Sequence, residues 1–254
     1  MTVRHAQLLS SLAAVFVTVA CSSYYEIPIE TPIRPKLDVS AFQRVLVAGF
    51  VSGGTEDVDG NLETTRLLRS QLRTKSDLRV IDTDVLPLMD VASQSRGAGA
   101  TPAATVGTPA AIREAKDLEP YEQVFANVEY WKRIGEEYQN PLIVTGTVMF
   151  TPLSRSGIVQ REQEVFDSVG RRSVVPIRTY MERKGFTLQP RFVFIDGRTG
   201  TTLYSENFRE EILYNANQTT PALSSYFELM DRLLPNFLST LSSQKIKGTR
   251  VLLQ

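Results

Sequence analysis

From Phe186 to Phe208 the chain reads FTLQPRFVFIDGRTGTTLYSENF, and this stretch decides the fold. Its two outer parts, 186–195 and 201–208, are rich in the aromatic and β-branched residues that are typical of strands. Between them, Asp196-Gly-Arg-Thr-Gly200 carries two glycines, as hairpin loops do. The stretch therefore predicts an antiparallel hairpin in the second half of the chain.

Upstream of the hairpin, short apolar runs bounded by turn residues alternate with segments of helical periodicity. Buried strands are expected at 44–50, 78–82 and 142–150. Helices are expected upstream at 58–72, 83–92 and 119–138, and after the hairpin at 224–241, the last kinked or split at Pro235. The sequence thus predicts an α/β fold with a mixed sheet and a three-layer-like order, β-α-β-α-β, followed by the antiparallel hairpin and a C-terminal helix.

The start of the chain has the order of a secretory signal. Arg4 precedes an apolar stretch over 8–20, and Cys21, the only cysteine, follows directly. The stretch is short for a membrane-spanning helix, which needs roughly 20 apolar residues. We therefore expect residues 1–20 to be a signal peptide and Cys21 to carry a lipid. Cleavage near Ala20 of an ordinary secreted protein, or a buried thiol, is the alternative.

Lipidation of Cys21 would leave the mature chain without a thiol, and the sole histidine, His5, would leave with the signal. This excludes Ser-His-Asp and Cys-His catalysis, histidine zinc sites and disulfides. Carboxylates remain, and Asp82 and Asp84 are the candidates for a carboxylate-dependent cell-wall hydrolase. The acids around Asp59 lack the spacing of a calcium loop and suit a helix N-terminus. We therefore expect a non-enzyme with no cofactor and no metal.

The charge balance gives no reason to expect nucleic acid as a partner. The chain has 28 basic and 28 acidic residues, and 42% of its residues are hydrophobic. Binding to nucleic acid depends on basic patches that neutralise phosphates. The composition is that of an ordinary globular domain.

Two segments differ from packed structure. Residues 21–37 carry closely spaced prolines, which favour an extended tether behind the lipidated cysteine. Residues 93–111 are rich in small and turn-forming residues and predict a disordered insertion. The remaining chain, 38–254, is expected to be a single domain that contains this insertion.

Residues 154–185 carry many charges and are expected to form a solvated hairpin or loop. Too few of their alternate positions are apolar for a channel strand, and Pro176 interrupts the return, which argues against a pore. Mixed arginines and aromatics can instead dock a partner. The candidate partner-binding residues are Arg161, Phe166, Arg171, Arg172, Arg178 and Tyr180.

Four segments carry a resemblance at the level of pattern: LDVSAFQRVLVAGF (37–50), LRVID (78–82), LIVTGTV (142–148) and VFIDGRTGTTLY (193–204). Together they resemble the envelope lipoprotein superfamily that contains the curli-secretion protein CsgG and the penicillin-binding-protein activator LpoB. Members of this superfamily are anchors, channel subunits or regulators. The resemblance therefore implies a binding or assembly role.

The sequence thus predicts a lipid-anchored envelope protein that binds another envelope protein or the peptidoglycan machinery. Ser22 stands where an inner-membrane retention signal would place Asp, which favours the outer membrane, with the domain facing the periplasm. An oligomeric secretion-channel or ring component is the first alternative, so a homo-oligomer stays open. The cell-wall hydrolase is the second.

Overall fold

The computed structural model describes residues 24–97, 112–166, 168–215, 218 and 220–253. The predicted signal peptide, Cys21, Ser22 and most of the predicted insertion lie outside the described residues. The chain divides into two units. Lys36–Leu241 is called the domain, and Met1–Pro35 with Ser242–Gln254 form the other unit.

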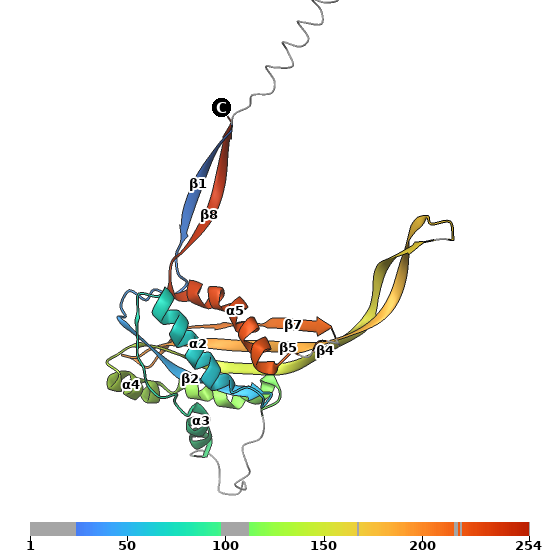
Figure 1. Cartoon of the computed structure of the whole chain (residues 1–254). Coiled ribbons are helices and arrows are strands. Elements are labelled where there is room, and N and C mark those ends of the chain that lie inside the picture. The colour runs from blue at the N-terminus through green and yellow to red at the C-terminus, as the bar shows by residue number, and fades with distance from the viewer. Residues whose placement is uncertain (1–23, 98–111, 167, 216–217, 219, 254) are drawn as a thin grey trace, which may run out of the picture. The chain divides into compact units, whose positions relative to one another are not determined.

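Within the described residues, the domain is built on a six-stranded sheet with the order β3-β2-β4-β5-β6, and β7 also pairs with β5 (Figure 1). Its strands are β2 (Arg44–Gly54), β3 (Arg79–Val80), β4 (Leu142–Phe166), β5 (Arg172–Asp196), β6 (Thr202–Asn207) and β7 (Glu210–Asn215). β2 is parallel to β3 and to β4, whereas β4, β6 and β7 are antiparallel to β5. The sheet is mixed, as the sequence predicted.

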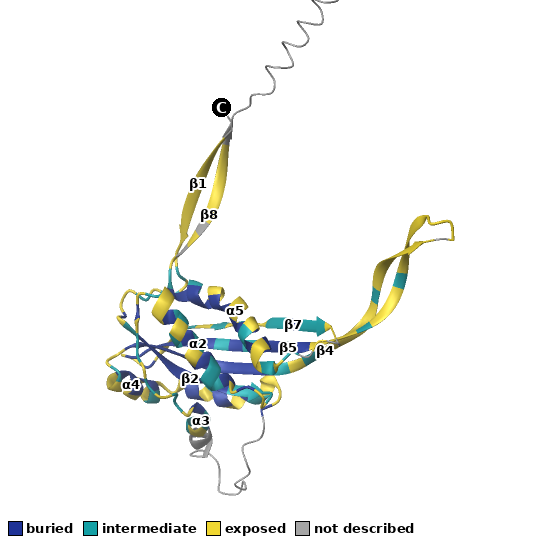
Figure 2. Cartoon of the chain, viewed as in Figure 1, coloured by how far each residue is buried: buried dark blue, intermediate teal, exposed yellow. Residues whose placement is uncertain are grey.

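Helices cover both faces of this sheet, and the middle strands are buried between them (Figure 2). The helices are α2 (Gly60–Lys75), α3 (Leu88–Gly97), the 3-10 helix η1 (Ala115–Ala126), α4 (Val128–Glu137) and α5 (Ala222–Leu241). α2 and α5 pack with even-numbered β4 residues such as Val144, while α3, η1 and α4 pack with odd-numbered ones such as Ile143. The three-layer α/β arrangement is confirmed.

The predicted hairpin is confirmed as β5 and β6. Phe194 lies opposite Tyr204, and the turn begins at Asp196, whose carboxylate accepts the Arg198 N–H at 2.8 Å. Gly200 closes the turn with φ +75, a conformation that favours glycine. Local turn chemistry therefore sets the register of this pair.

Three helices differ from their predicted bounds. The helix predicted over 119–138 is divided at Asn127, whose side chain accepts the Tyr130 N–H at 3.1 Å and starts α4. α3 begins at Leu88 and continues to Gly97, so the first residues of the predicted insertion are helical. α5 runs through Pro235 without a division, because its apolar face is buried along almost its whole length.

β4 and β5 continue far beyond the sheet as a two-stranded arm, residues 153–166 and 172–185 (Figure 1). Their pairing is unbroken from Leu142–Asp196 to Phe166–Arg172. The sequence placed the end of the strand at Phe150 and a charged hairpin or loop after it. The structure instead makes the charged segment a direct extension of two core strands.

The other unit is a two-stranded ribbon of β1 (Tyr24–Ile33) and β8 (Gln244–Leu253). The strands are antiparallel, with Tyr24 opposite Leu253 and Ile33 opposite Gln244. This differs from the sequence-based division, which made 21–37 an unpaired tether and placed the C-terminal segment in the domain. The tether region is extended as expected, but Tyr24–Ile33 has a strand partner.

Candidate functional site

The arm has two faces, because residues directly opposite each other in an antiparallel pair point to the same side. Ile158 lies opposite Tyr180 and Phe166 opposite Arg172, whereas Val159 lies opposite Thr179. Even-numbered residues of both strands therefore form one side, the even face. Odd-numbered residues form the other, the odd face.

The register divides the predicted partner-binding residues between these faces. The even face holds Phe166, Arg172, Arg178 and Tyr180. Arg161 lies on the odd face opposite Ile177, and Arg171 precedes the first residue of β5. The structure thus places four of the six on one face and Arg161 on the other, while Arg171 lies outside the two strands.

The even face mixes exposed apolar side chains with charges of both signs. Ile158 and Tyr180 are opposite each other and 71% and 67% exposed, and Phe166 at the far end is 65% exposed. Arg172 forms an ion pair with Glu164. The remaining charged residues of this face are Glu162, Arg178, Glu182 and Lys184. Covering this face would remove carboxylates from water, which is costly unless they are paired.

The odd face contains no acidic residue, and it combines a row of apolar side chains with arginines and a few neutral polar residues. Its apolar side chains are Leu153, Val159, Val165, Val175, Ile177 and Met181. Val159, Ile177 and Met181 are half-buried. Arg161 and Arg183 form no ion pair with any residue that the structure describes. Sequence reasoning missed this face, because the segment from Val175 to Met181 alternates only weakly: Thr179 is polar on this face, and Pro176 and Tyr180 are apolar on the other.

Ion pairs on the odd side hold the base of the arm. Arg155 Nη2 lies 2.7 Å from Glu211 Oε2, and Arg209 donates to Glu211 Oε1 at 2.7 Å. The hydrogen bond from Arg209 lowers the pKa of Glu211, and the charge of Arg155 adds to the effect. Glu211 lies on β7, so the arm is braced by a third strand where it leaves the sheet.

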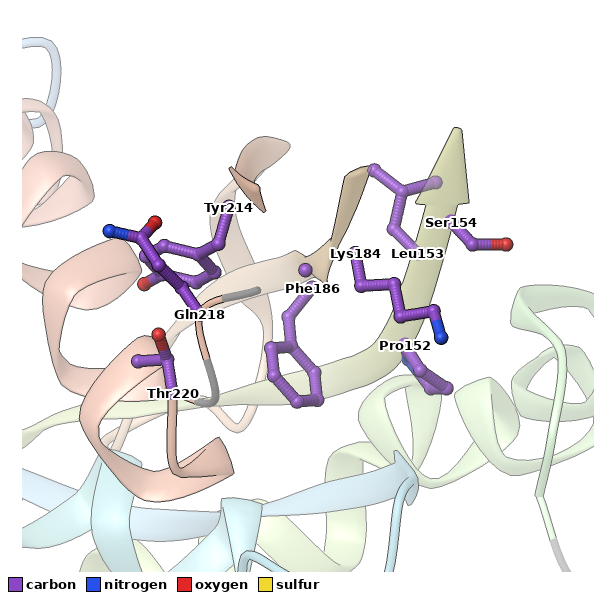
Figure 3. Close-up of a pocket in the computed structure, with 9 residues that line it drawn as sticks. Pro152, Leu153, Ser154, Lys184, Phe186, Tyr214, Gln218 and Thr220 are labelled. Atoms are coloured by element: carbon purple, nitrogen blue, oxygen red, sulfur yellow. The ribbon is translucent and has the colours of Figure 1, made fainter. Parts of the chain in front are cut away.

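A pocket of about 550 Å³ opens at the root of the arm (Figure 3). Phe186, which stacks on Phe150 with ring centroids 4.8 Å apart, forms part of its lining, with Lys184 and Tyr214 on either side. The Tyr214 hydroxyl donates to Glu228 at 3.1 Å, and desolvation raises the pKa of Tyr214. The other lining residues are Pro152, Leu153, Ser154, Gly185, Gln218 and Thr220. The apolar floor with a lysine at its side suits an anchoring side chain of a partner.

The other acidic residues that the sequence singled out are exposed. Asp82 is exposed and forms an ion pair with Arg73, and Asp84 is exposed; neither lines the pocket at the root of the arm. Asp59 caps α2 by accepting the Leu62 N–H at 3.0 Å, as expected for an acid at a helix N-terminus. Over the described ranges, no group of three or more His, Cys, Asp and Glu residues is placed to hold a metal ion.

No protein family and no curated protein matches the chain. Among solved structures, it is similar to the lipoprotein GNA1162 of Neisseria meningitidis, with 14% identity, a TM-score of 0.35, and 79% of this chain and 99% of that chain covered. The LpoB C-terminal domain of Salmonella enterica gives 9% identity and a TM-score of 0.27 over 70% of this chain and 84% of that one. A neuraminyllactose-binding hemagglutinin homologue of Helicobacter pylori gives 9% identity and a TM-score of 0.36 over 83% of this chain and 88% of that one.

At identities of 9 to 14% and TM-scores of 0.27 to 0.36, these similarities assign no function to this chain. The LpoB C-terminal domain and a lipoprotein are among these similar structures. A relation to CsgG stays a prediction. Of the helices that the structure describes, none is both long and apolar enough to cross a membrane.

Proposed function

We propose that this chain is a non-enzymatic envelope protein, anchored by a lipid on Cys21, that binds another envelope component through the odd face of the arm. The observation that carries this proposal is an apolar row without an acidic residue on a rooted, exposed pair of strands. Folding alone gives no reason to keep such a row outside the core. A partner that covers it removes apolar surface from water without burying a carboxylate.

The free cations of the odd face indicate the chemistry of the partner. Arg161 and Arg183 flank Val159, Ile177 and Met181, and neither is matched by a carboxylate within the described part of the chain. A complementary surface therefore has an apolar strip with acidic residues at its edges. We expect an envelope protein or a component of the peptidoglycan machinery with such a surface.

The proposed anchor and the arm have separate tasks. Lipidation of Cys21 would hold the chain at the membrane, and Ser22 at the next position favours the outer membrane with the domain facing the periplasm. The arm would supply partner recognition. Loss of the anchor should therefore change the location of the protein, whereas loss of the odd face should change only what it captures.

Adjacent positions on opposite faces give the sharpest test. A photo-crosslinking amino acid replaces Ile177 in one full-length variant and Arg178 in another, and both are expressed in cells beside a Cys21→Ala variant. We expect the position-177 probe to capture one dominant envelope protein and the position-178 probe to capture little of it. Positions 175 and 179 should behave as 177 does, and 174 and 180 as 178 does, because strands alternate with a period of two.

Other patterns assign a different role. Capture from even positions alone would make Phe166, Arg172, Arg178 and Tyr180 the interface, as the sequence predicted, and would overturn the odd-face proposal. Crosslinks to a second copy would instead support the oligomeric alternative. If wild type and Cys21→Ala fractionate alike, Cys21 is not an anchor.

A further inference from the structure

The β1/β8 ribbon has one strongly apolar face, which is separate from the arm. Ile27 lies opposite Arg250 and Ile29 opposite Gly248, so odd positions of β1 share a side with even positions of β8. We call this side the isoleucine face. Its β1 residues are Tyr25, Ile27, Ile29, Thr31 and Ile33. Tyr25 is 75% exposed, and the three isoleucines are 39 to 45% exposed.

The opposite face of the ribbon carries four of its five charged residues. Glu30 lies opposite Lys247, and its carboxylate is 3.1 Å from the ammonium of Lys245. Glu26 and Thr249 are on the same side, together with Tyr24, Pro28, Pro32 and Val251. The ribbon is therefore amphipathic: one face has most of the charges, and the other has the isoleucines, with Arg250 as its only charged residue among those described.

A two-stranded ribbon of this kind is at best marginally stable in water, and it gains stability when its apolar face is covered. Nothing in the described residues of this unit covers the isoleucine face. The edge of β1 is also a poor site for an added strand, because Pro28 and Pro32 offer no backbone N–H. The edge of β1 is therefore a less suitable site for a partner than the isoleucine face.

We propose that the isoleucine face lies on the surface of a lipid bilayer. This inference rests on the proposed lipid anchor, because Tyr24 stands only three positions after Cys21. Three residues span at most about 10 Å even when fully extended. A lipid on Cys21 would thus place the start of β1 at the membrane surface, with the apolar row beginning at the next residue.

The side chains of this face suit lipid better than a second copy of the chain. Tyr25, nearest to the anchor, combines an apolar ring with a hydroxyl, the character of side chains enriched at membrane interfaces. Arg250 has no acidic partner among the described residues and can reach lipid phosphates while its stem lies along apolar surface. If two copies met face to face, their Arg250 side chains would bring like charges into the same interface.

Single cysteines test this placement in the full chain. Once Cys21 is lipidated its thiol is consumed, so Ile29→Cys or Glu30→Cys supplies the only free thiol for a polarity-sensitive dye. The labelled proteins are placed in vesicles of phosphatidylethanolamine and phosphatidylglycerol that contain nitroxide-labelled lipid. We expect a blue-shifted dye at position 29 that the lipid quenches, and a water-like, unquenched dye at position 30.

Two outcomes would overturn the proposal. If both dyes are water-like, the ribbon stands in water. If the dye at 29 is blue-shifted but escapes quenching, and its shift grows with protein concentration, a second copy covers the face. The parent chain, which has no added cysteine, tests the anchor separately. If the dye labels it, the thiol of Cys21 carries no lipid, and the lipid-anchor proposal fails.

A second measurement does not depend on the anchor. In the Cys21→Ala chain without residues 1–20, the joint substitutions Ile27→Asp and Ile29→Asp should lower co-flotation with the same vesicles by about tenfold, since two apolar side chains no longer contact the bilayer. The control, Thr249→Asp with Val251→Asp, adds the same charge to the opposite face and should change co-flotation by less than about twofold. Equal losses in the two variants would show that charge alone decides binding and would contradict the proposal.

Discussion

The arm and the ribbon are both exposed pairs of antiparallel strands, but they are held in different ways. Each arm strand continues into the buried centre of a six-stranded sheet, where Val144 and Phe194 lie opposite each other (Figure 2). The ribbon pairs ten residues of β1 with ten of β8, and no third strand joins it within the described chain. The core therefore fixes the register of the arm, whereas the ribbon must fix its own.

Folding of the domain lowers the entropy cost of pairing β1 with β8. The Leu37 N–H donates to the Thr240 carbonyl at 3.0 Å, so the two chain segments that lead to β1 and β8 begin side by side. The entropy of bringing the ends together is thus lost when the domain folds. The arm is stabilised by the core and can therefore stay exposed when no partner is bound. The ribbon has no core of its own, so its stability increases when another surface covers its apolar face.

Removal of the arm should give the largest effect. Replacement of residues 157–181 by an Asn-Gly turn, which joins Ser156 to Glu182, should abolish partner capture, because both faces are lost. The free energy of unfolding should change by less than about 1 kcal/mol, since none of the deleted residues belongs to the buried core. Denaturant unfolding and the crosslinking experiment measure the two results. Unfolding of the domain would show that the arm is structural.

Adding a single methyl group at Gly185, at the root of the arm, should weaken the pairing of β5 with β7. A Cβ on Gly185 would lie 1.8 Å from the Ile212 carbonyl oxygen, so Gly185→Ala must displace β7 from β5. We expect a loss of about 2–4 kcal/mol in the free energy of unfolding. Gly157, farther along the arm, and Gly248, in the ribbon, have nothing within 4 Å of a built Cβ. Gly157→Ala and Gly248→Ala are the controls and should stay within about 0.5 kcal/mol of wild type.

The difference between strands in the core and strands outside it also explains which elements could be predicted from the sequence. Buried strands such as Leu142–Phe150 and the turn at Asp196 have strong local signals, and the mixed sheet followed from them. The outer arm alternates too weakly for its strands to be recognised, because charged and apolar side chains occur on the even face together. The pairing of Tyr24 with Leu253 has no local signal at all, since it joins the two ends of the chain, and Pro28 and Pro32 argue against a strand.

The candidate site was predicted in composition but not in geometry. The arginines and aromatics of 154–185 were recognised as residues that can dock a partner. Which of these residues lie on which face depends on the register of β4 with β5. That register is fixed in the core, where Leu142 pairs with Asp196, and it continues without a break into the arm. A shift of one residue in either strand would exchange its faces. Composition alone therefore cannot tell that Arg161 faces away from Tyr180.

Truncation of the chain before Gln244 should affect the ribbon alone. Without β8, the backbone amides of β1 lose their partners, whereas the buried core lies wholly within the domain. We expect β1 amides to lose hydrogen-exchange protection and arm amides to keep theirs, with the unfolding free energy of the domain changed by less than about 0.5 kcal/mol. Protection that persists in β1 would mean that another surface holds it.

The smallest effect should come from the charge at the root of the arm. Hydrogen bonding from Arg209 lowers the pKa of Glu211 in the folded protein, so its carboxylate stabilises the root above the pKa that an unfolded glutamate has. As the pH falls through the lowered value, Glu211 takes up a proton and this contribution is lost. Exchange protection near Arg155 should therefore decrease slightly on acidification, because the ion pair is exposed to solvent. Glu211→Gln should show the weaker protection already at neutral pH and should not respond further. An equal response in both proteins would assign the change to another group, and the root would then depend on strand pairing alone.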